Sequence, residues 1–264
     1  MELPIYQVDA FASEVFRGNP AAVMPLDAWL PDETLQALAM ENNLSETAFY
    51  VACDQGYQLR WFTPEVEVDL CGHATLAAAH VLFDHRAESA DVIRFQTRSG
   101  ELRVSRADRG ITLDFPAAEL VSSEVRDEVS QALGAEASQA VVAAQNAHAV
   151  VYVFESQAQV AALQPNFSAL SEVSDLAIIA SAPGENSDFV SRFFGPQVGI
   201  DEDPVTGSAH CSLVPYWAER LQTNALSARQ ISSRGGDLAC TLRDGRVFMS
   251  GQAVTFMIGT VFLS

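Results

Sequence analysis

The sequence contains no lysine, and all 15 of its basic residues are arginines. This absence excludes enzymes that form a Schiff base with an internal lysine, such as pyridoxal-phosphate enzymes and lysine-dependent aldolases. It also excludes a Walker P-loop, because that motif requires its lysine. Two explanations of the absence stay open. One is a genomic preference for arginine, and the other is adaptation to salt, in which a large net charge keeps a protein soluble.

Positive charge is scarce in general. The 15 basic residues face 34 acidic ones, which gives a net charge of −19. Nucleic acids and anionic membranes are bound by basic surfaces, so we expect neither as a partner. No apolar run reaches the ~18 residues of a membrane span, and the N-terminal segment lacks the features of a signal peptide. We therefore expect a cytoplasmic protein whose four cysteines are free thiols: Cys53, Cys71, Cys211 and Cys240.

Several segments of the chain occur twice in the same order. Ordered pairs with a similar spacing indicate two copies of one supersecondary unit. The sequence thus predicts two similar α/β halves, residues 1–118 and 119–264, with the last few C-terminal residues allowed to complete the first. The paired segments are Asn19–Val23 with Asn146–Val150, Phe62–Val66 with Phe194–Val198, Cys71–Ala74 with Thr206–Ala209, and Arg98–Phe115 with Arg234–Gly251. In the last pair, Asp108-Arg109-Gly110 and Asp244-Gly245-Arg246 are expected to form hairpin turns.

A helix of small and apolar residues is expected after the glycine of each Cys/Thr-Gly-x-Ala segment, over Ala74–Phe83 and Ala209–Leu221. A helix that is apolar on most faces is buried. The N-terminus of such a helix offers free N–H groups and a partial positive charge, which bind a carboxylate. Two such ends facing a cleft between the halves suit a small acidic substrate. Pro215 should kink or restart the second helix, and Ala253–Leu263 should form a buried strand.

Two residues of the first half are candidates for acid/base chemistry. Glu46 precedes an apolar strand, Ala48–Ala52, so it is either a general acid/base or a solvated loop residue. His73 precedes the first buried helix, so it is either a functional group or a hydrogen-bonded core histidine. A nucleophilic pair of Cys71 and His73 is disfavoured, because residues two apart rarely align a thiolate with an imidazole.

In the second half, the segment Asp201–His210 is strongly polar just before the second buried helix. Asp203 and Ser208 are candidates to bind an amine or a carboxylate of a substrate. Ser208 and Thr206 could instead cap the helix.

Metal and cofactor sites find little support. Zinc could be bound by Cys71, His73, His210 and Cys211, but the sequence has no CxxC or HExxH motif, so no metal site is predicted. No GxGxxG follows a strand, so a dinucleotide cofactor is not expected either.

Together the motifs resemble the phenazine-biosynthesis PhzF-like family over nearly the whole chain. The resemblance implies a diaminopimelate epimerase-like fold of two pseudo-repeated, barrel-like α/β halves, each with a central buried helix. It also implies a homodimer that works without a cofactor. It rests on Val8–Phe11, Gly18–Val23, Asn43–Phe49, Arg60–Pro64, Glu67–Thr75 and Asp203–His210.

The resemblance also implies roles for individual residues. The best-known member of the family isomerises a dihydro-hydroxyanthranilate by moving a proton between carbons. The catalytic residues would be Glu46, His73 and Asp203, and the substrate-binding residues would be Asn19, Gly72, Gly207 and Ser208.

One position departs from the related epimerases, which use a pair of cysteines as base and acid. Here Cys71 stands at the first position, but Thr206 stands at the second. A hydroxyl is far less acidic than a thiol of pKa about 8.5, which disfavours racemisation by two thiols and favours Glu46. The sequence therefore predicts an isomerase that shifts a proton on a small carboxylate-bearing substrate. The alternatives are a catalytically silent protein that binds small acids and, with less support, a metal-dependent hydrolase.

Overall fold

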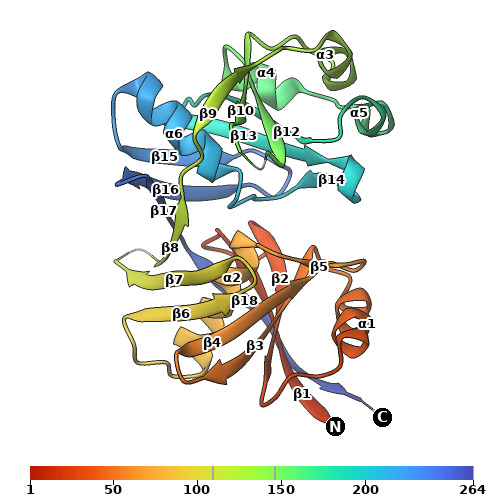
Figure 1. Ribbon diagram of the computed structural model, residues 1–264, viewed down its shortest axis with the longest axis vertical. Coiled ribbons are helices and arrows are strands. Elements are labelled where there is room, and N and C mark those ends of the chain that lie inside the picture. The colour runs from red at the N-terminus through yellow and green to blue at the C-terminus, as the bar shows by residue number, and fades with distance from the viewer. Residues whose placement is uncertain (109, 146, 264) are drawn as a thin grey trace. The chain divides into compact units, whose positions relative to one another are not determined.

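The structure is a computed structural model that describes residues 1–108, 110–145 and 147–263. The chain forms two compact units (Figure 1). Unit 1 consists of residues 1–114 and 250–264, and unit 2 consists of residues 115–249. Two residues of the predicted repeats, Arg109 and Asn146, lie outside the described residues. Among the residues that are described, no helix is long and apolar enough to cross a membrane.

Unit 1 is a sheet with two helices between its strands. The pairing runs β18–β1–β2–β3–β4–β6–β7–β8, with β2–β3 and β4–β6 parallel and the other pairs antiparallel. The strands are β1 (Glu2–Ala10), β2 (Asn19–Leu26), β3 (Glu46–Cys53), β4 (Gly56–Phe62), β5 (Glu67–Val68), β6 (Val92–Thr97), β7 (Gly100–Ala107), β8 (Gly110–Pro116) and β18 (Ala253–Phe262). The helices are α1 (Asp32–Asn42) and α2 (Gly72–His80), and α2 continues as a π-helix, η1 (Val81–His85).

Unit 2 repeats this arrangement. Its pairing runs β9–β10–β11–β12–β13–β15–β16, with β11–β12 and β13–β15 parallel and the other pairs antiparallel. The strands are β9 (Leu120–Ser123), β10 (Gln139–Ala143), β11 (Ala149–Val153), β12 (Ala177–Pro183), β13 (Phe189–Gly195), β14 (Ile200–Asp203), β15 (Ala225–Gln230), β16 (Gly236–Arg243) and β17 (Arg246–Gly251). The helices are α3 (Asp127–Leu133), α4 (Gln157–Ala162), α5 (Phe167–Val173), a 3₁₀ turn η2 (Pro196–Val198) and α6 (His210–Leu221).

The two units thus share one topology. In each unit, an antiparallel pair of strands is followed by a parallel pair, β2–β3 or β11–β12. A short strand then pairs with the next long strand, β5 with β4 and β14 with β13. A helix, α2 or α6, precedes the strand that is parallel to that long strand, β6 or β15. This confirms the predicted α/β fold of two repeated halves. The turn at Asp244 and Gly245 is also confirmed, because both residues adopt positive φ angles, 52° and 70°, as a tight hairpin requires.

The central helix of unit 1 is buried along its entire length. Every residue of α2 is buried, and the helix contacts β1, β2, β3 and β18, among which Figure 1 shows it. Its small side chains, chiefly alanine, allow this close approach of strands on several sides. The corresponding helix of unit 2, α6, buries only part of its surface, because its last residues from Glu219 to Leu221 are exposed.

Pro215 does not restart α6, which runs without interruption from His210 to Leu221. Proline has no N–H group, so the carbonyl of Cys211, four residues earlier, loses its helical partner. The backbone N–H of Ala118 donates to that carbonyl instead, at 2.9 Å. This donor satisfies the carbonyl and explains why the helix continues.

The predicted C-terminal strand exists, but it is not buried. β18 pairs with β1, and Phe256, Met257, Ile258 and Phe262 expose between 42% and 73% of their surface. An apolar run of this length does not by itself distinguish a core strand from one with an open face.

Candidate functional site

Four polar side chains of unit 1 gather where three elements begin. Asn19 and Glu46 are the first residues of β2 and β3, Cys71 is the N-cap of α2, and His73 lies in the first turn of that helix. Because β2 and β3 are parallel and in register, with Ala21 opposite Glu46, their first residues lie at the same edge of the sheet. The parallel pairing therefore brings Asn19 and Glu46 together.

His73 is the centre of this cluster. Its Nε2 atom lies 3.0 Å from Oε2 of Glu46, and its Nδ1 atom lies 3.1 Å from Nδ2 of Asn19 and 3.5 Å from Sγ of Cys71. The hydroxyl of Ser45 donates to Oδ1 of Asn19 at 3.4 Å. The side chains of His73 and Glu46 are only 5% and 12% exposed. Glu46 is thus held against a buried imidazole and is not a solvated loop residue.

The ionisation of the cluster follows from its burial and charges. Burial alone would lower the pKa of His73, but the interactions with Cys71 and Glu46 raise it well above 6.5. Burial and the nearby Glu46 raise the pKa of the Cys71 thiol to about 11, so this thiol is neutral near pH 7. We therefore attribute the protonation of His73 to the carboxylate of Glu46.

The same three residues offer a possible set of metal ligands, since one donor atom each of Glu46, Cys71 and His73 lies within 4.8 Å of the others. Their orientation does not suit one ion. Cys71 approaches Nδ1 of the ring and Glu46 approaches Nε2, and the lone pairs of these two nitrogens point away from each other. An ion in the plane of the ring can meet only one of them, so the arrangement fits proton transfer better.

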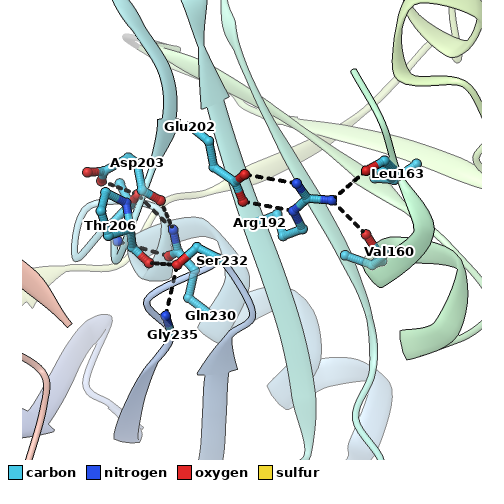
Figure 2. Close-up of polar contacts among 10 residues, drawn as sticks. Val160, Leu163, Arg192, Glu202, Asp203, Thr206, Gln230, Ser232 and Gly235 are labelled. Atoms are coloured by element: carbon cyan, nitrogen blue, oxygen red, sulfur yellow. Dashed lines mark hydrogen bonds and ion pairs between the residues drawn. The ribbon is translucent and has the colours of Figure 1, made fainter. Parts of the chain in front are cut away.

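A buried glutamine holds the polar segment Asp201–His210 of unit 2 in place by hydrogen bonds (Figure 2). Gln230 accepts a hydrogen bond from the backbone N–H of Thr206 at 2.9 Å and donates to the carbonyl of Asp203 at 2.7 Å. The hydroxyl of Thr206 donates to Oδ2 of Asp203. Gln230 is fully buried, and Asp203 is 7% exposed. Sequence reasoning missed Gln230, because nothing in β15 distinguishes it from an ordinary strand residue.

The strand that carries Asp203 is braced from its other side. Figure 2 shows the guanidinium of Arg192 paired with the carboxylate of Glu202 through two contacts of 2.8 Å. The same guanidinium donates to the carbonyls of Val160 and Leu163 at the end of α4. Such two-pronged pairs fix geometry as well as charge, so the end of β14 is rigidly held.

Thr206 and Ser208 do not cap α6. The N-cap is Ala209, no side chain caps the helix, the Thr206 hydroxyl is bonded to Asp203, and Ser208 is exposed. The carbonyls of Gly207 and Ser208 accept from the first residues of the helix. Their own N–H groups donate to no partner among residues 1–108, 110–145 and 147–263, which leaves them available to a ligand.

The predicted site residues therefore form two groups. Asn19, Gly72 and His73 lie with Glu46 in unit 1, and Asp203, Gly207 and Ser208 lie on one segment of unit 2. Of the residues weighed as zinc ligands, His210 donates through Nδ1 to the carbonyl of Thr206, 2.9 Å away, and burial lowers the pKa of His210 to about 4. His210 is thus a neutral core histidine.

Comparison with known proteins gives a consistent result. The model of the PhzC-PhzF family, described as phenazine biosynthesis-like protein, matches residues 8–259. An uncharacterized isomerase of Pseudomonas aeruginosa is 52% identical, and one of Halalkalibacterium halodurans is 45% identical, with 100% of both chains covered in each case.

Solved structures agree. A phenazine biosynthesis protein of the PhzF family from Enterococcus faecalis superposes with a TM-score of 0.95 at 46% identity, covering 100% of both chains. A hydroxyproline epimerase from Agrobacterium vitis, solved with bound trans-4-hydroxy-L-proline, has a TM-score of 0.61 at 10% identity, covering 98% of this chain and 92% of its own. At that identity only the fold is shared.

Proposed function

The chain belongs to the phenazine biosynthesis-like (PhzC-PhzF) family and is an isomerase, and from this premise we propose that it moves a proton between carbon atoms of a small carboxylate-bearing substrate by general acid/base catalysis. The observation that carries the proposal is the buried contact of 3.0 Å between Glu46 and His73. A carboxylate held in this way can take a proton from one carbon and return it at another.

The proposed roles within unit 1 follow from the contacts. Glu46 accepts the carbon-bound proton and becomes a carboxylic acid, then gives the proton back at a second carbon, so that no proton is gained or lost. His73 stays protonated and orients Glu46 through Nε2, while its Nδ1 atom faces the sulfur of Cys71, which can accept a hydrogen bond. Gly72 lies in the first turn of α2, where N–H groups have no helical acceptor and can bind a carboxylate.

For unit 2 we propose that the free N–H groups of Gly207 and Ser208 bind an anionic group of the substrate and that Asp203 acts as a polar catalytic partner. Two observations support this proposal. These N–H groups are available, and Gln230 fixes the segment by hydrogen bonds to the backbone of Thr206 and Asp203. The expectations of a cytoplasmic homodimer that needs neither cofactor nor metal stay predictions.

Exchange of carbon-bound hydrogen tests the proposal. Small cyclic and open-chain carboxylic and amino acids that raise the melting temperature of the protein are incubated with it in D₂O and followed by proton NMR. We expect at least one bound acid to lose a C–H signal as deuterium enters, since Glu46 exchanges its proton with solvent between transfers. Bound acids that keep every C–H signal would contradict the proposal and favour a silent acid-binding protein.

The pH profile gives a second test. The interactions with Cys71 and Glu46 raise the pKa of His73 well above 6.5, although burial alone would lower it. The protonated ring is therefore present below that raised pKa, and kcat/KM is expected to fall only as pH rises through it. The measurement is kcat/KM from neutral to alkaline pH, with His73→Gln expected to lack this alkaline limb. A limb in the wild type near the ordinary histidine value of about 6.5 would contradict the assignment.

A further inference from the structure

A second histidine cluster lies in unit 1, at the other end of α2. The Nε2 atoms of His80 and His85 lie 2.9 Å and 2.7 Å from the same atom, Oγ1 of Thr255. The two rings are 5.7 Å apart at an angle of 80°. Each ring meets the hydroxyl through Nε2, so both Nε2 atoms are directed at a single point. This differs from His73, whose two neighbours approach opposite nitrogens.

Two local irregularities create the convergence. In an α-helix, residues five apart lie on different faces, because each residue turns the chain by about 100°. The π-helix η1 instead closes a bond from the N–H of Arg86 to the carbonyl of Val81, which stacks such residues and brings His80 beside His85. On the facing strand, Val8 pairs with Thr255 and Gln7 with Met257, so the ladder shifts at this point. Both π-turns and bulges are frequent at functional sites.

An acidic neighbour completes the arrangement. Oδ2 of Asp84 lies 3.2 Å from Nδ1 of His80. A carboxylate on the outer nitrogen fixes the proton there and leaves Nε2 with a free lone pair, as in carboxylate–histidine–metal sites. His80 and Asp84 line a cavity of about 230 Å³. Arg106, on β7, lines the same cavity and brings a positive charge to it.

We propose that His80 and His85 bind a divalent transition-metal ion of the Zn²⁺ or Cu²⁺ type through their Nε2 atoms, with Asp84 orienting His80. The ion would take the present position of the Thr255 hydroxyl oxygen, so the Thr255 side chain would rotate away and water molecules would complete the ligand set. Zinc–imidazole bonds measure about 2.0–2.1 Å, so each ring needs to move by less than about 1 Å. His85 and Asp84 are exposed, which gives the ion access from solvent. The ion would link His80 at the end of α2 to His85 at the end of η1.

The test is titration of the full, untagged chain with Cu²⁺, followed by electron paramagnetic resonance and calorimetry. We expect one ion with two nitrogen ligands in the wild type. His85→Gln, at an exposed position, should lose one nitrogen signature and weaken binding at least about tenfold. Asp84→Asn should weaken it by about 10–100-fold, the usual effect of removing a second-shell partner. The same order should appear when Zn²⁺ replaces Cu²⁺.

Two control variants make the result specific. His148→Gln removes a histidine of unit 2, and Cys71→Ser alters the group of Glu46, Cys71 and His73, whose donor atoms lie within 4.8 Å of one another. Both control variants should bind Cu²⁺ with the affinity of the wild type. Circular dichroism should show that every variant is folded. Equal affinity of the wild type and His85→Gln, or loss of the ion in Cys71→Ser, would overturn the proposal.

Discussion

Glu46→Gln is expected to lower kcat by about 10²–10⁴-fold, the contribution of a general acid/base, while the protein remains folded. The amide cannot accept a proton from carbon, but its oxygen can keep the close contact with Nε2 of His73. The loss should therefore appear in kcat and in the exchange of C–H for deuterium, with a melting temperature close to that of the wild type. The measurement is steady-state turnover of whichever acid shows exchange.

Glu41→Gln is the matched control for this experiment. It makes the same change at an exposed acid near the end of α1 and should leave kcat unaltered. If Glu46→Gln retained turnover similar to that of Glu41→Gln, another group would have to move the proton. Glu46→Asp adds a further check, because it keeps the carboxylate but withdraws it from the ring of His73. Its kcat should lie between those of Glu46→Gln and Glu41→Gln.

The fold could be predicted because its evidence is local and repeated. Paired segments such as Phe62–Val66 and Phe194–Val198 fall at the ends of equivalent strands, β4 and β13. The Asp-Gly pair at positions 244 and 245 is typical of a hairpin turn, and both residues adopt the positive φ angles that such a turn requires. Such features depend on neighbouring residues, so a single sequence displays them. The exposed face of β18 depends on which strands cover it, and apolar composition alone did not reveal that.

The site was only partly predictable, because its contacts depend on how separate elements pack together. Glu46 and His73 stand in short motifs, but their contact depends on the parallel register of β2 with β3 and on the entry of α2. Gln230 acts through backbone atoms more than twenty residues away along the chain. His80 and His85 become neighbours only through a π-turn that helical spacing does not predict. Tertiary register, which no local pattern encodes, decides the contacts of Glu46 and Gln230.

Gln230→Leu is expected to destabilise the protein by about 2–6 kcal/mol. Leucine is similar in size but removes the hydrogen bonds that Gln230 forms with the N–H of Thr206 and the carbonyl of Asp203, in a site where Gln230 is fully buried. A buried polar group that loses its partner costs about 1–3 kcal/mol, and two such groups are affected. Urea unfolding measures the difference, with Gln131→Leu on the exposed side of α3 as the control.

The same variant tests whether the Asp203 segment serves catalysis. Without Gln230, the hydroxyl of Thr206 still reaches Asp203, but the backbone that presents Gly207 and Ser208 loses its buried anchor. A loosened segment should bind the substrate less well, so KM should rise more than kcat falls, at a temperature where the variant is fully folded. Thr206→Val removes the hydroxyl and keeps the Gln230 contact to the backbone, so it should affect KM less. If Gln230→Leu were as stable as Gln131→Leu and kept its KM, the glutamine would neither stabilise the fold nor position this segment.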